Sequence, residues 1–249
     1  MAPTFSLSAA GIEVVLCDIE GTTTPISFVH DILFPYARAR IASFLHAHAT
    51  DPEVLAIVDA LRAEQRVAVE TAPTGDRAPS RESPPSDLVK YVHELIDRDR
   101  KSGPLKALQG RIWKDGYASG ELRGEVYPDV PGAFARWTTA GVRVAIFSSG
   151  SVLAQQLIFG RSTAGDLQPF LSAYFDTRVG AKGEPDSYRR IADALGVPAV
   201  RVLFLSDVVA ELVAARAAGM HTLLSVRGPA PAPDAPGFDA ITSFDAIGH

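Results

Sequence analysis

The chain has 249 residues, of which 47% are hydrophobic and 21% are charged, and its formal net charge is -5 at pH 7. These values are ordinary for a globular protein of one large domain, or of one domain plus an insert. The negative charge and the lack of a basic block disfavour nucleic acid as a partner, and no apolar run is long enough to span a membrane.

The N-terminus and the single cysteine bear on location and redox chemistry. Residues 1–10 lack the charged start and long apolar core of a signal peptide, so a cytoplasmic protein is expected. Cys17 has no second cysteine to pair with, which excludes an internal disulfide and fits a reducing compartment. Because Cys17 lies inside an apolar run, we expect an inert buried thiol rather than a catalytic one.

The apolar run 12–17 predicts a buried strand that ends at two acids, Asp18 and Glu20. Residues at i and i+2 of an extended segment point the same way, so both carboxylates project from the carboxyl end of this strand. Ligands bind at that end in open α/β sheets. Two close carboxylates repel unless a cation or a shared proton relieves them, and oxygen ligands suit Mg²⁺. The alternative is a strand that simply ends in a polar turn.

The stretch 28–121 lacks a good strand and carries helical patterns. Helices are predicted from residue 28, from Asp51 as N-cap with Pro52 behind it, over 86–99 and over 105–117. A flexible, exposed loop rich in Pro, Ser and Gly is predicted over 71–85. The whole stretch is therefore predicted to be a helical insert between two parts of an α/β domain.

After the insert, buried strands alternate with helices. Strands are predicted at 142–147, 201–205 and 221–226, with shorter ones near 173–175 and 240–241, and helices at 133–140, 152–159 and 184–195. A Pro- and Ala-rich surface loop is predicted over 228–237. This alternation predicts a doubly wound, mostly parallel, Rossmann-like sheet with helices on both faces.

Polar residues follow three of the predicted strands and meet at one edge of the sheet. They are Asp18 with Glu20, Ser148 with Ser149, and Ser206 with Asp207. A helix starts close behind Ser148 and Ser149, and helix amino ends favour an anion, although capping by Ser explains the same pattern. Lys182 lies in a glycine-flanked loop, and Glu211 follows Asp207 by one helical turn.

This arrangement of Asp, Ser, Lys and a later acid resembles the signature of haloacid dehalogenase-like phosphatases. The string Asp18-Ile19-Glu20-Gly21-Thr22-Thr23 is more specific, since most of that superfamily carries Asp where Glu20 stands. It resembles the enolase-phosphatase family of methionine salvage (acireductone synthase). Matching strings are FSSGSV at 147–152, QQLIFG at 155–160, EPDSYRRI at 184–191 and FLSD at 204–207, although that family more often has Thr at Ser206. The similarity covers nearly the full length.

The resemblance implies a fold and a set of roles. The core domain would comprise 1–27 and 122–249, and the helical cap domain 28–121. Asp18 would be the nucleophile that forms an aspartyl-phosphate. One Mg²⁺ per subunit would be held by Asp18, Asp207 and the backbone carbonyl of Glu20, whose side chain stays free as acid/base. Ser148, Ser149 and Lys182 would bind the phosphoryl oxygens, and Glu211 would support the metal ligands from behind.

The implied substrate is 2,3-diketo-5-methylthiopentyl 1-phosphate, a small phosphate ester that is enolised and then dephosphorylated to the acireductone 1,2-dihydroxy-3-keto-5-methylthiopentene. The resemblance also suggests a monomer. Three other functions stay open at this stage: a phosphatase of the same fold for another small ester, a dehalogenase without a metal, and a non-catalytic Rossmann-type binding module. The last is disfavoured because no Gly-x-Gly-x-x-Gly follows the first strand.

Overall fold

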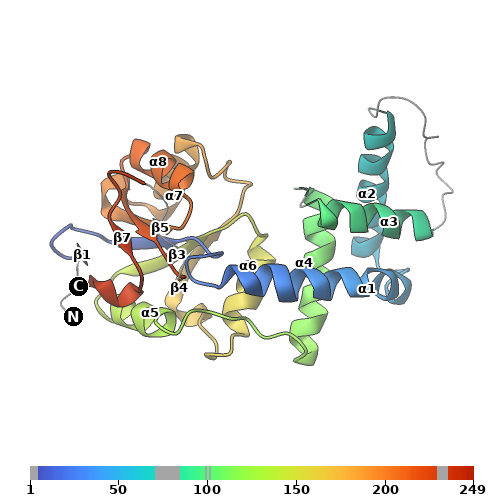
Figure 1. Cartoon of the computed structure of the whole chain (residues 1–249), viewed down its shortest axis with the longest axis horizontal. Coiled ribbons are helices and arrows are strands. Elements are labelled where there is room, and N and C mark those ends of the chain that lie inside the picture. Colours follow the sequence, from blue (N-terminus) through green and yellow to red (C-terminus); the bar gives the residue numbers. More distant parts are fainter. Residues whose placement is uncertain (1–4, 71–84, 99, 101, 229–234) are drawn as a thin grey trace. The chain divides into compact units, whose positions relative to one another are not determined.

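The structure is a computed structural model that describes residues 5–70, 85–98, 100, 102–228 and 235–249. The chain forms two compact units (Figure 1). One comprises Met1–Val29 and Arg123–His249, and the other comprises His30–Leu122. Residues 71–84 of the predicted loop over 71–85, and residues 229–234 of the predicted loop over 228–237, lie outside the described residues, while Pro85 begins a helix.

The first unit is built on a six-stranded sheet in which every neighbouring pair is parallel, in the order β4-β3-β2-β5-β6-β7. The strands are β2 (Val14–Cys17), β3 (Arg143–Phe147), β4 (Leu171–Phe175), β5 (Val202–Ser206), β6 (His221–Ser225) and β7 (Ala240–Ile241). The predicted doubly wound parallel sheet is confirmed. The chain starts in the middle of the sheet and extends it first on one side and then on the other.

Helices cover both faces of this sheet, as Figure 1 shows. They are α5 (Val130–Thr139), α6 (Val152–Gly160), α7 (Pro185–Leu195) and α8 (Val209–Ala217). Alternate strand residues such as Leu16 and Phe204 pack with α7 and α8 in one apolar core, together with Tyr188. All four residues of β2 are buried, as expected for a strand covered on both faces. Cys17 is buried as predicted, and that burial raises the pKa of its thiol.

A second, two-stranded sheet joins the two ends of the described chain. Strand β1 (Phe5–Ser6) pairs in parallel with β8 (Ile247–Gly248). Neither strand is among those predicted from the sequence.

The second unit is helical throughout its described secondary structure. It contains a π-helical turn at Phe28–Leu33, shared with the first unit, and then α1 (Phe34–Ala47), α2 (Pro52–Glu70), α3 (Pro85–Asp97) and α4 (Gly103–Ser119). Asp51 caps α2 as predicted, since its carboxylate accepts a hydrogen bond from the Glu53 backbone N–H at 2.9 Å. Helix α4 packs on α1 and α2, and the Arg38–Asp97 ion pair joins α1 to α3.

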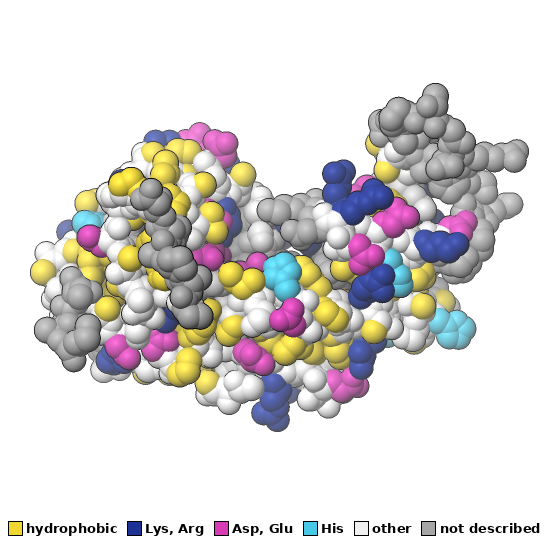
Figure 2. All heavy atoms as spheres, in the orientation of Figure 1, with side chains coloured by type: hydrophobic (Ala, Val, Ile, Leu, Met, Phe, Trp, Pro, Cys, Tyr) yellow, Lys and Arg dark blue, Asp and Glu magenta, His cyan; other side chains and the backbone are white. Residues whose placement is uncertain are grey.

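The surface of the second unit is charged with both signs. Figure 2 shows acidic and basic side chains interspersed on its visible face. Such mixing is typical of a solvated surface and differs from the basic stripe that tracks a phosphate backbone. Within the described part of the chain, no helix has the length and apolar character needed to cross a membrane.

Candidate active site

The register of the sheet brings three polar strand ends together. β2 lies between β3 and β5, with Cys17 opposite both Ile146 and Leu205. The pairing continues past the strand, because the Asp18 backbone N–H donates to the Leu205 carbonyl at 2.9 Å. The chain therefore leaves the sheet at Asp18, at Ser148 and at Ser206 along a single edge, as the sequence predicted.

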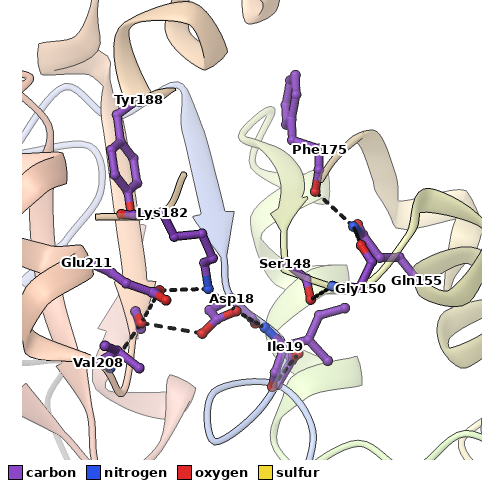
Figure 3. A network of polar contacts seen from close by, with 12 residues as sticks. Asp18, Ile19, Ser148, Gly150, Gln155, Phe175, Lys182, Tyr188, Val208 and Glu211 are labelled. Atoms are coloured by element: carbon purple, nitrogen blue, oxygen red, sulfur yellow. Dashed lines mark hydrogen bonds and ion pairs between the residues drawn. The ribbon is translucent and has the colours of Figure 1, made fainter. Parts of the chain in front are cut away.

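Asp18 is held at this edge by a buried ion pair, drawn in Figure 3. Its carboxylate is almost inaccessible and its Oδ1 lies 2.6 Å from Lys182 Nζ, while the same oxygen accepts the Ile19 backbone N–H at 2.7 Å. Lys182 Nζ also lies 2.7 Å from Glu211 Oε2. Burial by itself would lower the pKa of Lys182, but Asp18 and Glu211 outweigh it and raise that pKa. Lys182 is therefore a fixed cation in this site.

The loop that carries Lys182 is fastened by the start of α7. The Tyr188 hydroxyl donates to the Lys182 carbonyl at 2.7 Å, and the Ser187 hydroxyl donates to the Ala181 carbonyl at 2.6 Å. Tyr188 is fully buried between the rings of Phe147 and Phe204. A loop lysine that sequence alone would leave in solvent is thus fixed from the core.

Ser206 connects the two carboxylates on either side of the lysine. Its hydroxyl lies 2.9 Å from Glu211 Oε2 and 3.4 Å from Asp18 Oδ2, and it accepts the Val208 backbone N–H at 3.1 Å. The hydroxyl has one proton, and the shorter distance assigns it to Glu211. The second oxygen of Asp18 therefore keeps lone pairs for another partner.

Asp207 is the carboxylate least balanced by positive charge. Burial, the Asp18 charge and the Glu211 charge raise the pKa of Asp207 to about 7, although its own backbone N–H and Lys182 act in the opposite direction. Gly21 lies against this side chain with a φ of 69°, and a Cβ on Gly21 would overlap the Asp207 carboxylate. Only glycine fits here, because both the space and the backbone conformation exclude a side chain.

These residues fit a divalent cation. Asp18, Asp207 and Glu211 face a single lysine, and the raised pKa of Asp207 marks the missing positive charge. The donors are all oxygens, which suits Mg²⁺. Among the described residues, no three His, Cys, Asp or Glu side chains form a metal-ligating group. The predicted Mg²⁺ ligands do not require such a group of three side chains, since they are two carboxylates and a backbone carbonyl.

The loop after β3 forms the other side of the site and carries no charge. The Ser148 hydroxyl accepts the Gly150 backbone N–H at 3.1 Å, and Ser149 follows half-buried. The fully buried Gln155 donates from its Nε2 to the carbonyls of Gly150 at 3.0 Å and Phe175 at 2.8 Å (Figure 3). Gln155 thereby ties this loop, called here the serine loop (148–151), to the end of β4.

The amino end of α6 is capped by the protein's own side chains. The Ser151 hydroxyl accepts the Ala154 backbone N–H at 3.3 Å, which is the Ser capping considered as the alternative above. The Asp176 carboxylate takes hydrogen bonds from the backbone of Val152 and from Arg178, and these outweigh burial and lower the pKa of Asp176. An anion at this edge would therefore meet Ser148 and the serine-loop backbone rather than an open helix end.

The sequence predicts the charged residues of the site but not the roles of the residues that support them. Gln155 and Tyr188 lie within the strings that match the family, and no sequence pattern singles out Arg227. A glutamine on the buried face of an apolar helix, as Gln155 is, is a usable signal. The half-buried Glu20 lies in the turn after β2, one residue before Gly21.

The chain was compared with protein-family models and with known sequences. The family described as haloacid dehalogenase-like hydrolase matches residues 12–219. A protein of Synechococcus elongatus called enolase-phosphatase E1 is 51% identical, over 95% of this chain and 98% of its own. A protein of Drosophila melanogaster with the same name is 48% identical, over 94% of this chain and 90% of its own.

Solved structures agree with these matches. The UTR4 protein of Saccharomyces cerevisiae superimposes with a TM-score of 0.75 at 34% identity, covering 94% of this chain and 99% of that one. CbbY from Rhodobacter sphaeroides, solved in complex with phosphate, gives a TM-score of 0.56 at 21% identity over 94% of this chain and 95% of its own. The latter similarity supports the fold alone.

Proposed function

The chain belongs to the enolase-phosphatase E1 family of haloacid dehalogenase-like hydrolases, and on that premise we propose that it converts 2,3-diketo-5-methylthiopentyl 1-phosphate to 1,2-dihydroxy-3-keto-5-methylthiopentene and phosphate in methionine salvage. The observation that carries the proposal is the buried Asp18 at the end of β2, paired with Lys182 at 2.6 Å. A carboxylate so placed is oriented by its ammonium partner and lies at the edge of the sheet where α/β proteins bind their ligands.

Asp18 is the nucleophile. A carboxylate oxygen attacks phosphorus, the bond from phosphorus to the enol oxygen breaks, and an aspartyl-phosphate forms. Water then cleaves the acyl phosphate, which returns Asp18 and releases phosphate. Lys182 orients Asp18 and, with Ser148 and the serine-loop backbone around Ser149, binds the phosphoryl oxygens where negative charge is concentrated.

Glu20 is the proposed general acid/base. It lies two residues beyond the nucleophile, and its predicted metal contact uses the backbone carbonyl, so the acid/base role is assigned to its side chain. The first half of the reaction removes a proton from the carbon that bears the phosphate. The second half needs a proton for the departing enol oxygen, and Glu20 would supply it.

One Mg²⁺ would be held by Asp18, Asp207 and the Glu20 carbonyl, with Glu211 behind them. When bound, it neutralises phosphate charge and polarises the substrate oxygens. The protein supplies the buried carboxylates and the close approach of Gly21 to Asp207.

The helical unit, His30–Leu122, is proposed to act as the cap that excludes water and contacts the methylthio tail. The predicted cap boundaries at 28 and 121 are part of this proposal, and so is the monomeric state. A phosphatase for another small ester is the second candidate, because the residues on the sheet edge would serve it equally.

The test follows phosphate release and enol absorbance together, with the diketone phosphate as substrate and Mg²⁺ present. The proposal predicts that both signals rise in the wild type and that a chelator abolishes phosphate release. Phosphate release from a panel of small esters, without turnover of the diketone phosphate, would identify the second candidate.

A further inference from the structure

The turn that carries Glu20 is held from outside by three hydrogen bonds. The Ser225 hydroxyl donates to the Gly21 carbonyl at 3.2 Å, Arg227 Nε donates to the Thr22 carbonyl at 3.0 Å, and the Tyr127 backbone N–H donates to the Thr23 carbonyl at 3.0 Å. Three successive carbonyls are thus fixed by the end of β6 and by the segment before α5. None of these donors belongs to the residues assigned to catalysis above.

Internal bonds make this turn a rigid body. The backbone N–H groups of Thr22, Thr23 and Thr24 all point to the Ile19 carbonyl, at 2.9 to 3.1 Å, and the Thr23 hydroxyl donates to the Asp18 carbonyl at 3.1 Å. The Gly21 N–H closes the turn on the Thr24 carbonyl at 2.9 Å. A turn of this kind moves as one piece, so its outer contacts set the position of Glu20.

The Arg227 side chain is itself held in place by several contacts. Its side chain is only 5% exposed, and its Nη1 lies 2.6 Å from Asp129 Oδ2. The guanidinium lies over the rings of Tyr127 at 4.8 Å and Phe244 at 4.2 Å. A buried, stacked and forked cation of this kind suits Arg and not Lys, because only guanidinium is planar and offers donors in several fixed directions.

Asp129 fixes the arginine in turn. Its Oδ2 also accepts the Ser243 hydroxyl at 3.1 Å and the Phe244 backbone N–H at 2.5 Å. Burial favours the neutral acid, but the hydrogen bonds from Arg227 and Phe244 prevail and lower the pKa of Asp129, so the pair is ionised. A buried ion pair adds little to stability compared with apolar packing, whereas it fixes geometry.

We infer that Arg227, assisted by Ser225, is a positioning residue for the reaction: it fixes the Gly21–Thr24 turn and so places the Glu20 carboxyl against the leaving group beside Asp18. The inference rests on the acid/base role given to Glu20 in the proposed function. Its test therefore uses model esters that report on that role without the diketone phosphate.

The experiment compares two esters, p-nitrophenyl phosphate and ethyl phosphate, in the full-length protein with Mg²⁺. A nitrophenolate leaves without a proton, whereas an ethoxide needs a general acid. Arg227→Met is expected to lower kcat/KM for ethyl phosphate by about 10- to 100-fold, the loss typical of a misplaced catalytic group, and that for p-nitrophenyl phosphate by less than about threefold. Glu20→Gln should give the same selectivity, and the double variant should show no further change.

Arg136→Met is the matched control. Arg136, on α5, pairs at 2.9 Å with Asp245, the residue after Phe244, and both side chains are exposed. It should leave the ratio between the two esters unchanged. If Arg227→Met does not fold, as judged by circular dichroism, Arg227→Lys and Ser225→Ala are measured instead and should shift the ratio in the same direction.

The inference is wrong if the ratio of kcat/KM between the two esters is unchanged in every folded variant. It is also wrong if the effects of Arg227→Met and Glu20→Gln multiply in the double variant. Failure of the proposed function is seen separately: the wild type would then hydrolyse both model esters but leave the diketone phosphate intact.

Discussion

The two sides of the candidate active site differ in charge. The carboxylate side (Asp18, Asp207, Glu211 with Lys182) gathers three acids around one cation and leaves the pKa of Asp207 raised to about 7. The serine loop is neutral, and Gln155 satisfies its Gly150 carbonyl. Figure 3 shows Asp18, Lys182 and Glu211 of the first side and Ser148, Gly150 and Gln155 of the second in one view.

The two sides therefore require different things from a ligand. The carboxylate side lacks positive charge, so a divalent cation relieves it and its properties should change with metal and pH. The serine loop is already fixed by its own hydrogen bonds, so it can receive phosphoryl oxygens without rearrangement. Substitutions on the first side should act on the chemical step, and those on the second should act mainly on binding.

The largest effect is expected at Asp18. Asp18→Asn keeps the shape of the side chain but removes the nucleophilic charge, so phosphate release should fall by at least about 1,000-fold while Mg²⁺-dependent substrate binding and the fold remain. Phosphate release in single turnover measures this. Asp186→Asn, at an exposed carboxylate on α7, is the control. Substantial release by a clean Asp18→Asn preparation would remove Asp18 from the role of nucleophile.

The next largest effect is expected when the Asp207 carboxylate is removed. Asp207→Ala should abolish turnover at ordinary Mg²⁺ levels and be partly rescued by high Mg²⁺, because a carboxylate is lost from a hard-cation site. Calorimetry of Mg²⁺ binding checks the assignment. An unchanged Mg²⁺ affinity would show that Asp207 is not a ligand.

The raised pKa of Asp207 makes metal-free stability depend on pH. Folding raises this pKa from 3.8 to about 7, so the folded state binds the proton more tightly than the unfolded state. The cost of ionising Asp207 is therefore absent below pH about 4 and grows as the pH rises to about 7. Without metal, Asp207→Asn should melt above the wild type at pH 8, by about 2 °C or more, and close to it at pH 4. Thermal melts at both pH values, with and without Mg²⁺, test this.

The variant Glu20→Gln tests whether the side chain of Glu20 acts as the acid or base. An enol conjugated to a ketone is a more acidic leaving group than an alcohol and needs less protonation as it departs. Glu20→Gln should therefore slow hydrolysis of an alkyl phosphate more than release from the enol phosphate. If Glu20 is instead the enolising base, the variant should leave the diketone phosphate unconverted and still cleave a pre-formed enol phosphate. Equal, near-native rates on both would exclude either role.

The residues of the site that follow the strands can be predicted from the sequence better than the residues that hold them in place. Asp18, Ser148 and Ser206 could be placed because buried strands end abruptly at them, and parallel strands share an edge. Lys182 could not be placed by pattern alone, since its position depends on Tyr188, which lies in the core six residues further on. Arg227 acts on residues about 200 positions earlier in the chain, and sequence periodicity has no signal for such a contact.

The smallest of these effects is expected on the neutral side, at Gln155. Gln155→Met keeps the length of the side chain and removes the donors to the Gly150 and Phe175 carbonyls. The Phe175 carbonyl keeps the Ser148 backbone N–H at 3.2 Å, whereas the Gly150 carbonyl loses its side-chain donor, which costs about 1 kcal/mol or more, so the serine loop should loosen. We therefore expect the KM for substrate and the inhibition constant of phosphate to rise several-fold, with kcat and Mg²⁺ affinity nearly unchanged. Gln156→Met is the control, because the neighbouring Gln156 side chain is exposed. A loss in kcat equal to that of a variant on the carboxylate side would show that the two sides do not divide the work of binding and chemistry.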